Sequence, residues 1–324
     1  MIDPFLETVS RIIRAGQNSN SYKFALLRAL AYIASREASN PKTISRDRLA
    51  ECFIAFYWDL TLKYHVRQGT NPDKDPRVMR LIRNLLGTHR ISEKTTLQEL
   101  QTKDDHKRLV KQVAREAFDD VIPRLHTVRG GEQKPKLYEQ EGDGIRIEDR
   151  TFEFLKSHSQ VITQLAIGGW VGFTEQFTSA PKLFQKIQGV DPSRAALSFY
   201  RKFLAPYSNN QCFYCENKVG ARPHADHVIP WSYILEDKAW NLVLSCDRCN
   251  RNKWYYLPPE QPFLDKLIQR NQLLIHANLQ SFPNGTKIKR DFVEWDAPRL
   301  DKHIRESWHK AQADGFSVWK RSLS

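Results

Sequence analysis

Cysteine is scarce in this chain and unevenly placed. The 324 residues include five cysteines, and Cys52 alone lies outside residues 212–249. The first residues lack the basic segment and following apolar segment of a secretory signal. These absences argue against a disulfide framework and predict an intracellular, cytoplasmic protein. Cys52 is flanked by apolar residues, so we expect it to be a small buried hydrophobe.

Long apolar runs and an excess of acidic residues are also missing. The longest apolar stretch, near Val161–Phe173, is interrupted by Gln164, Gly168 and Gly169, so we expect no membrane span. Lysine and arginine number 50 against 37 acidic residues, which gives a net charge of +13. Such a balance favours a polyanionic partner such as nucleic acid. Most of the excess, +9, lies at or before Ala205.

The remaining four cysteines form two Cys-x-x-Cys pairs with thirty residues between them. Each pair can present two thiolates to one ion, and Zn²⁺ prefers four such ligands in a tetrahedron. Two disulfides or a redox pair are the alternatives, but the pairs have neither a secretory signal nor a strand–Cys-x-x-Cys–helix context. We therefore predict a structural zinc site made by Cys212, Cys215, Cys246 and Cys249.

The spacer between these pairs is long enough to hold structure of its own. Its pattern predicts a strand at Ala225–Ile229, a second strand at Asn241–Ser245 and a helix over Cys246–Tyr256. Polar side chains from all three elements could converge beside the zinc site. These side chains are Asp226, His227, Asn241 and Asn250.

Residues 212–253 resemble the HNH endonuclease family, because they carry its motif in order. The motif comprises Cys-x-x-Cys, Asp-His-apolar-apolar-Pro, Asn-Leu-apolar-apolar and Cys-x-x-Cys-Asn-x-x-Lys. The chain departs from the commoner form at two places. Residues 232–240 replace a frequent Gly-Gly after the first strand, and Asn250 replaces the last histidine, which is a familiar variant.

The resemblance implies roles for the four polar residues. Asp226 and Asn250 would bind one Mg²⁺ or Mn²⁺, since hard cations prefer oxygen ligands. His227 would be the general base that deprotonates water, and Asn241 would hold the histidine-bearing loop by hydrogen bonds. The cation would neutralise charge on the transition state, and the products would carry 5′-phosphate and 3′-hydroxyl ends.

Other residues of the module are candidates for contact with nucleic acid. Lys253 shares the helix face of Asn250 and could meet a phosphate. His224 shares the strand face of Asp226, so either a ligand or substrate contact or a structural role fits it. Arg248 and Arg251 fit phosphate contacts or a solvated helix face equally well. Large apolar residues nearby, Trp231 and Trp240, are expected to pack the module.

Helical periodicity dominates the rest of the chain. The expected helices are Phe5–Ala15, Ser21–Glu37, Ser45–His65, Pro76–Leu86, Asp104–Val121, Phe152–Phe177, Pro181–Ile187, Ser193–Leu204, Pro262–Leu279 and Arg299–Ala313. Gly168-Gly169 suggests a kink. Between the helices we expect a loop or hinge at Val128–Gly144, a short strand at Ile145–Ile147 and a linker at Ala205–Asn210.

Two of these helices carry rows of basic residues at helical spacing, which fit either DNA contact or solvation. The rows are Arg77, Arg80 and Arg83, and Lys107, Lys111 and Arg115. In the C-terminal part we expect Trp295, Trp308 and Trp319 to be buried and His303 and His309 to lie on the surface.

The sequence therefore predicts a mainly α protein with a small α+β module. A helical, basic N-terminal domain would span residues 1–205, and residues 206–324 would hold an HNH module with core 212–257 and C-terminal helical support. The expected function is metal-dependent hydrolysis of DNA. By analogy of domain layout, the role would be restriction or anti-phage defence, with a mobile-element enzyme or a repair nuclease as alternatives. The alternatives are a catalytically silent zinc module for nucleic-acid binding or assembly, and an RNA-directed nuclease. Duplex cleavage by one site would need a homodimer or two binding events, and a defence role would bring partner proteins.

Overall fold

The chain forms two compact units in the computed structural model, which describes residues 3–88, 91–190, 197–221 and 223–320. The first unit contains the described residues up to Thr178 together with Leu183–Val190, and the second contains Ser179–Lys182 and the described residues from 197 onward. The domain boundary expected after Ala205 falls inside a helix of the second unit. No helix in the described part of the chain is both long and apolar enough to cross a membrane.

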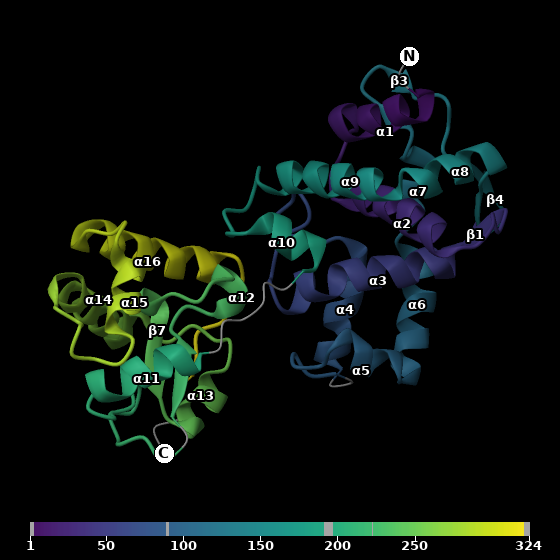
Figure 1. Cartoon of the computed structure of the whole chain (residues 1–324). Helices are drawn as coiled ribbons and strands as arrows, with labels where there is room; N and C mark the ends of the chain where they lie inside the picture. The colour runs from purple at the N-terminus through teal and green to yellow at the C-terminus, as the bar shows by residue number, and fades with distance from the viewer. Residues whose placement is uncertain (1–2, 89–90, 191–196, 222, 321–324) are drawn as a thin grey trace. The chain divides into compact units, whose positions relative to one another are not determined.

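The first unit is a helical assembly around one buried helix. Its helices are α1 (Pro4–Ala15), α2 (Tyr22–Arg36), α3 (Arg46–Leu62), α4 (Arg77–Gly87), α5 (Leu97–Gln101), α6 (Asp104–Glu116), α7 (Val121–Arg124), α8 (Asp149–Ser157), α9 (Ser159–Thr174) and α10 (Leu183–Gln188). Eleven of the fifteen residues of α2 are buried, so this helix forms the core. It packs against α3, α8 and α9 (Figure 1).

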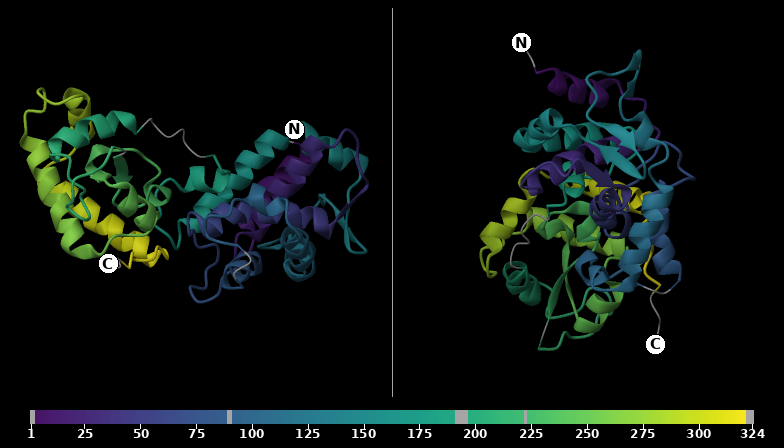
Figure 2. Two further views of the ribbon diagram at one scale, coloured as in Figure 1. Left: turned by 90° about the horizontal axis from the view of Figure 1, so that it is seen from below. Right: turned by 90° about the vertical axis from the view of Figure 1, so that its right-hand side faces the viewer.

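Helix α9 is continuous through Gly168 and Gly169, where we expected a kink. A Cβ atom on Gly169 would lie 2.6 Å from Ile13 Cγ2 and 2.9 Å from Phe24 Cε1. Gly169 therefore allows α9 to approach α1 and α2 closely. Both views in Figure 2 show the teal ribbon of α9 beside these purple helices.

Short strands border the helices of the first unit. They are β1 (Thr43–Ser45), β2 (Thr127–Val128), β3 (Gly131–Glu132), β4 (Glu139–Glu141) and β5 (Gly144–Arg146). Strand β5 lies between β1 and β4 in an antiparallel sheet, which confirms the strand predicted near Ile145. The loop predicted over Val128–Gly144 is wrong in part, because β2 and β3 form a hairpin there. Its turn contains Gly130 and Gly131 at positive φ, a conformation that glycine adopts without strain.

The two rows of basic residues in the first unit are largely engaged in ion pairs. The pairs are Arg77 with Glu116, Arg83 with Asp75, Lys107 with Asp104, Lys111 with Asp47, and Arg115 with Glu116. Each pair offsets the charge that a phosphate backbone would meet. The rows therefore present less free positive charge than their sequences suggest.

The second unit surrounds a two-stranded antiparallel sheet. Its elements are α11 (Ser198–Tyr207), β6 (His224–His227), α12 (Trp231–Ile234), the 3-10 helix η1 (Ala239–Asn241), β7 (Leu242–Ser245), α13 (Asp247–Lys253), α14 (Glu260–His276), α15 (Gly285–Lys289), the 3-10 helix η2 (Arg290–Phe292) and α16 (Ala297–Ala313). Strands β6 and β7 pair from His224 with Ser245 to His227 with Leu242. Helix α13 packs against β6, and α14 packs against α16 (Figure 1).

Helix α11 occupies part of the segment predicted to be a linker. It packs on both β6 and β7 and buries Phe203 and Leu204. Pro206 lies inside its last turn. The linker prediction is wrong for Ala205–Tyr207, which form the last turn of the helix that buries Phe203 and Leu204.

Tryptophans stabilise the C-terminal part of the second unit by burial. Trp308 and Trp319 are buried as predicted, whereas Trp295 is only partly buried. The prediction that His303 is a surface residue is wrong in part, because its ring is half-buried. Its ring lies 4.7 Å from the Trp295 ring and 5.0 Å from the Trp240 ring, between centroids, and burial lowers its pKa. The predicted fold class, mainly α with a small α+β module, is confirmed.

Candidate active site and zinc centre

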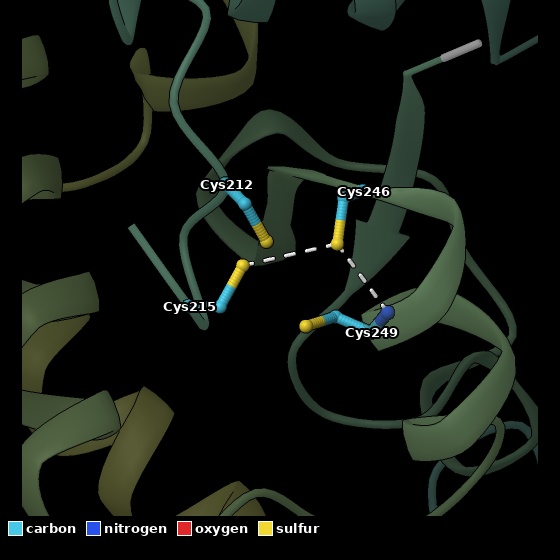
Figure 3. A group of neighbouring side chains, drawn as sticks. All are labelled: Cys212, Cys215, Cys246 and Cys249. Carbon is cyan, nitrogen blue, oxygen red and sulfur yellow. Dashed lines mark hydrogen bonds between the residues drawn. The ribbon is translucent and has the colours of Figure 1, made fainter. Parts of the chain in front are cut away.

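The four motif cysteines come together at one end of the β6–β7 sheet. Cys212 and Cys215 lie on the turn after α11, Cys246 caps the N-terminus of α13, and Cys249 lies one turn into that helix (Figure 3). Their sulfurs all lie within 4.8 Å of one another. The four thiols are not joined in disulfides, which removes the disulfide alternative.

The dimensions of this cluster fit a tetrahedral zinc ion. Zinc–sulfur bonds of about 2.3 Å in a tetrahedron place two sulfurs about 3.8 Å apart. The Sγ atoms of Cys215 and Cys246 are separated by 3.8 Å. Burial raises the pKa of the Cys212 thiol, so a bound cation is the means of holding it as a thiolate. The cluster is thus a four-cysteine zinc site.

Asp226 and Lys253 form a buried ion pair between β6 and α13. The Lys253 Nζ atom lies 3.3 Å from Asp226 Oδ2 and donates a 2.6 Å hydrogen bond to the carbonyl of His227. The Tyr214 hydroxyl donates to the same Oδ2 atom at 2.5 Å. Lys253 is fully buried, so the expected phosphate contact at this residue is wrong. Instead, its ammonium group joins α13 to the strand that carries Asp226 and His227.

His227 contacts a carboxylate that the motif does not contain. Its Nε2 atom lies 2.8 Å from Asp237 Oδ1, and both side chains are buried. Asp237 belongs to the loop between α12 and η1, which lies within residues 232–240, the segment that replaces the family's usual Gly-Gly. The loop turns back after α12 because Leu235 adopts a left-handed conformation at φ 55°.

Asn241 holds the chain that follows β6. Its Oδ1 atom accepts from the backbone N–H of Ile229, and its Nδ2 atom donates to the carbonyl of the same residue, both at 2.8 Å. The side chain is fully buried, so these two bonds satisfy groups that water cannot reach. The amide thereby fixes the turn two residues beyond His227.

The remaining candidates lie along α13 and the start of β6. Asn250 is half-buried, and its side chain has no hydrogen-bond partner among the described residues. The His224 Nε2 atom lies 3.4 Å from Asp247 Oδ1. Arg251 also pairs with Asp247, and both Arg248 and Arg251 are exposed.

The structure brings the predicted residues together less closely than the motif suggests. Asp226 and His227 are consecutive on β6, so their side chains leave opposite faces, toward Lys253 and Asp237 respectively. Lys253 bridges Asp226 to the His227 backbone. Sequence reasoning missed Tyr214 and Asp237. The position of Tyr214 inside the first Cys-x-x-Cys pair is a signal in the sequence that could have identified it. Asp237 has no such signal, because no periodic pattern marks it.

Comparisons with known protein families match both parts of the chain. A family model described as a domain of unknown function (DUF8808) matches residues 4–187, and one described as HNH endonuclease matches residues 206–259. Neither a curated protein nor a solved structure matches the chain. The first match covers more than half of the 324 residues and the second covers the zinc site, β6, β7 and α13. The chain therefore belongs to the DUF8808 family and carries an HNH endonuclease module with a four-cysteine zinc site.

Proposed function

We propose that this protein is a metal-dependent endonuclease that hydrolyses DNA phosphodiester bonds, with His227 as its general base. The proposal rests on the position of the His227 imidazole within the HNH module. This side chain is 9% exposed, and Asp237 fixes it through a hydrogen bond. An imidazole can accept a proton from water near neutral pH. A module that only bound nucleic acid would have no need of it.

Asp226 and Asn250 are the residues we propose as ligands of a Mg²⁺ or Mn²⁺ ion. Both contacts of the Asp226 carboxylate use Oδ2, so Oδ1 has no partner among the described residues. The Asn250 amide is also without a partner in this part of the chain. One carboxylate oxygen and one amide oxygen suit a hard cation. A bound cation would stabilise the negative charge that develops on the phosphate and on the departing 3′ oxygen.

Five residues would then act around the scissile phosphate. His227 would take the proton of the attacking water. Asn241 would keep the turn after β6 in place through its two bonds to Ile229. Arg248 and Arg251, which are exposed on α13, would meet phosphates beside the scissile one, and His224 would contact the substrate from the same strand face as Asp226.

One observation favours a second function, nucleic-acid binding without cleavage. Lys253 already neutralises Asp226 in the protein's interior, as expected of a carboxylate with a structural role. If Asp226 has only this structural role and Oδ1 binds no divalent cation, the proposed cation site does not form. The module would then be a zinc-held binding element.

Incubation of the purified protein with supercoiled plasmid and with RNA of the same sequence separates these functions. We expect Mg²⁺ or Mn²⁺ to support nicking or linearisation of the plasmid. Mild EDTA should abolish cleavage before zinc is lost, because four thiolates hold zinc more tightly than two oxygen ligands hold a hard cation. Cleavage of RNA alone would contradict the DNA substrate. Binding of both nucleic acids without cleavage would support the second function. A role in restriction or anti-phage defence would be tested by protection of cells against phage.

A further inference from the structure

His227 belongs to the HNH motif but Asp237 does not, so the motif does not explain the contact between them. We propose that Asp237 is a positioning residue that fixes the ring orientation and the tautomer of His227, so that Nδ1 is the nitrogen that accepts the proton of water. This inference rests on the proposed function of His227 as the general base. It assigns a catalytic consequence to the loop of residues 232–240, in which this chain departs from the commoner form of the family.

The geometry of the pair determines which nitrogen carries hydrogen. An ionised carboxylate only accepts hydrogen bonds, so the nitrogen that faces Asp237 Oδ1 at 2.8 Å must donate. That nitrogen is Nε2, and in a neutral ring Nδ1 is then the basic atom. Nδ1 of His227 has no hydrogen-bond partner among the described residues, and it is not sealed from solvent.

Burial makes this contact stronger than an ordinary surface pair. The side chains of His227 and Asp237 are 9% and 7% exposed. A second histidine–carboxylate pair in the same module, His224 with Asp247, is 36% and 50% exposed and has a longer separation of 3.4 Å. Solvent screens the exposed pair, whereas the buried pair keeps its preferred geometry.

The loop that carries Asp237 is braced from three elements. Tyr200 on α11 donates its hydroxyl to the Asp237 carbonyl at 2.7 Å. Asp291 of η2 accepts from the backbone N–H of Ala239 at 2.8 Å, and Arg270 of α14 donates to the Ala239 carbonyl at 2.9 Å. A side chain that orients a catalytic group must itself be held rigidly, and these bonds hold the backbone at Asp237 and two residues after it.

The tautomer can be measured directly in the wild-type protein. Nitrogen-15 NMR of histidine-labelled, zinc-loaded protein without Mg²⁺ or Mn²⁺ distinguishes the two ring nitrogens, and the signals missing from His227→Ala identify the residue. We expect the Nε2–H tautomer at pH 8, with Nδ1 unprotonated. An Nδ1–H tautomer would overturn the proposal whether or not the protein cuts nucleic acid.

Kinetics then test whether the orientation matters for turnover. Asp237→Ala should lower kcat at least tenfold with KM changed less than twofold, by analogy with the effect of removing the hydrogen-bond partner of a metal-bound histidine. Asp237→Asn keeps an oxygen that can accept from Nε2–H, so we expect a smaller loss of kcat. Glu236→Gln is the matched control, since it removes the same charge one residue away, and its kcat should stay within twofold of wild type.

The outcomes separate this inference from the proposed function. A wild-type protein that cleaves neither DNA nor RNA would remove the proposed function, while the NMR result would still decide the tautomer. A folded, zinc-loaded Asp237→Ala protein with kcat within twofold of wild type would overturn the positioning role alone. If Asp237→Ala fails to fold, Asp237→Asn replaces it in the same comparison: a kcat below that of Glu236→Gln supports the role, and an equal kcat overturns it.

Discussion

Replacement of Lys253 by methionine should destabilise the second unit by about 3–5 kcal/mol, the usual cost of removing one partner from a buried ion pair. The Lys253 side chain is fully buried, and that of Asp226 is 9% exposed. Methionine keeps most of the apolar volume but removes the ammonium group. Asp226 would retain Tyr214 as its partner, and the His227 carbonyl would lose its 2.6 Å donor.

Urea unfolding followed by tryptophan fluorescence measures this change at a fixed zinc concentration. Six of the eight tryptophans lie at or beyond Trp231, so the signal reports mainly on the second unit. Lys302→Met is the matched control, because Lys302 is 77% exposed and 3.8 Å from Glu306. A surface pair of this kind contributes at most about 1 kcal/mol.

A double variant separates the charge pair from the packing. Lys253→Met combined with Asp226→Asn removes both charges, so it should recover a large part of the loss seen in Lys253→Met alone. A Lys253→Met protein whose free energy of unfolding lies within about 1 kcal/mol of the wild-type value would refute the reasoning, since a buried carboxylate that has lost its cationic partner should destabilise the fold by more. If the double variant is no more stable than Lys253→Met alone, the shape of the Lys253 side chain, and not its charge, is what stabilises the second unit.

Three further predictions address the helical core, the zinc site and a buried histidine. Gly169→Ala should lower the free energy of unfolding by about 1–3 kcal/mol, because the added methyl group overpacks against Ile13 and Phe24. Gly168→Ala has open space at its Cβ, so it should raise the free energy of unfolding by up to about 1 kcal/mol, and urea melts measure both changes. Elemental analysis should find about one zinc per chain, and Cys215→Ser should lower both zinc content and solubility. Burial lowers the pKa of His126 to about 4, so its ring stays neutral in the fold while the unfolded ring protonates below about pH 6.5. His126 should therefore contribute a fall in stability of about 2 kcal/mol between pH 7 and pH 5, and His126→Gln should reduce the difference between melts at these two values by that amount.

The parts of the fold that sequence reasoning anticipated are those with a repeating or spaced pattern. The two Cys-x-x-Cys pairs indicated one cluster because ligand spacing is a local property of the chain. Apolar periodicity located α2 within a residue at each end, a β-type run ended by Pro230 located β6, and alternation located β7. Such signals depend on neighbours in sequence and need no knowledge of the tertiary fold.

The parts that were missed depend on contacts between distant segments. A lysine at the end of a helix is expected to be exposed, and Lys253 is buried because Asp226 and Tyr214 lie against it. Asp237 reaches His227 through the left-handed turn at Leu235, a conformation that composition does not indicate for leucine. The end of α11 has the composition of a loop, yet burial of its apolar face on the sheet keeps it helical.

Cleavage of supercoiled plasmid by His227→Ala tests the central claim most directly, with His224→Ala as the matched control on the same strand. His227→Ala removes the proposed base and leaves Asp226, Asn241 and the zinc cluster in place. We expect a folded protein that binds DNA and nicks it about a hundredfold or more slowly than wild type, the usual size of a general-base contribution. His224→Ala should lose much less activity than His227→Ala, since its half-buried ring is paired with Asp247 and is proposed only to contact the substrate. A His227→Ala protein, purified free of contaminating nuclease, that nicks plasmid at the wild-type rate would contradict the account.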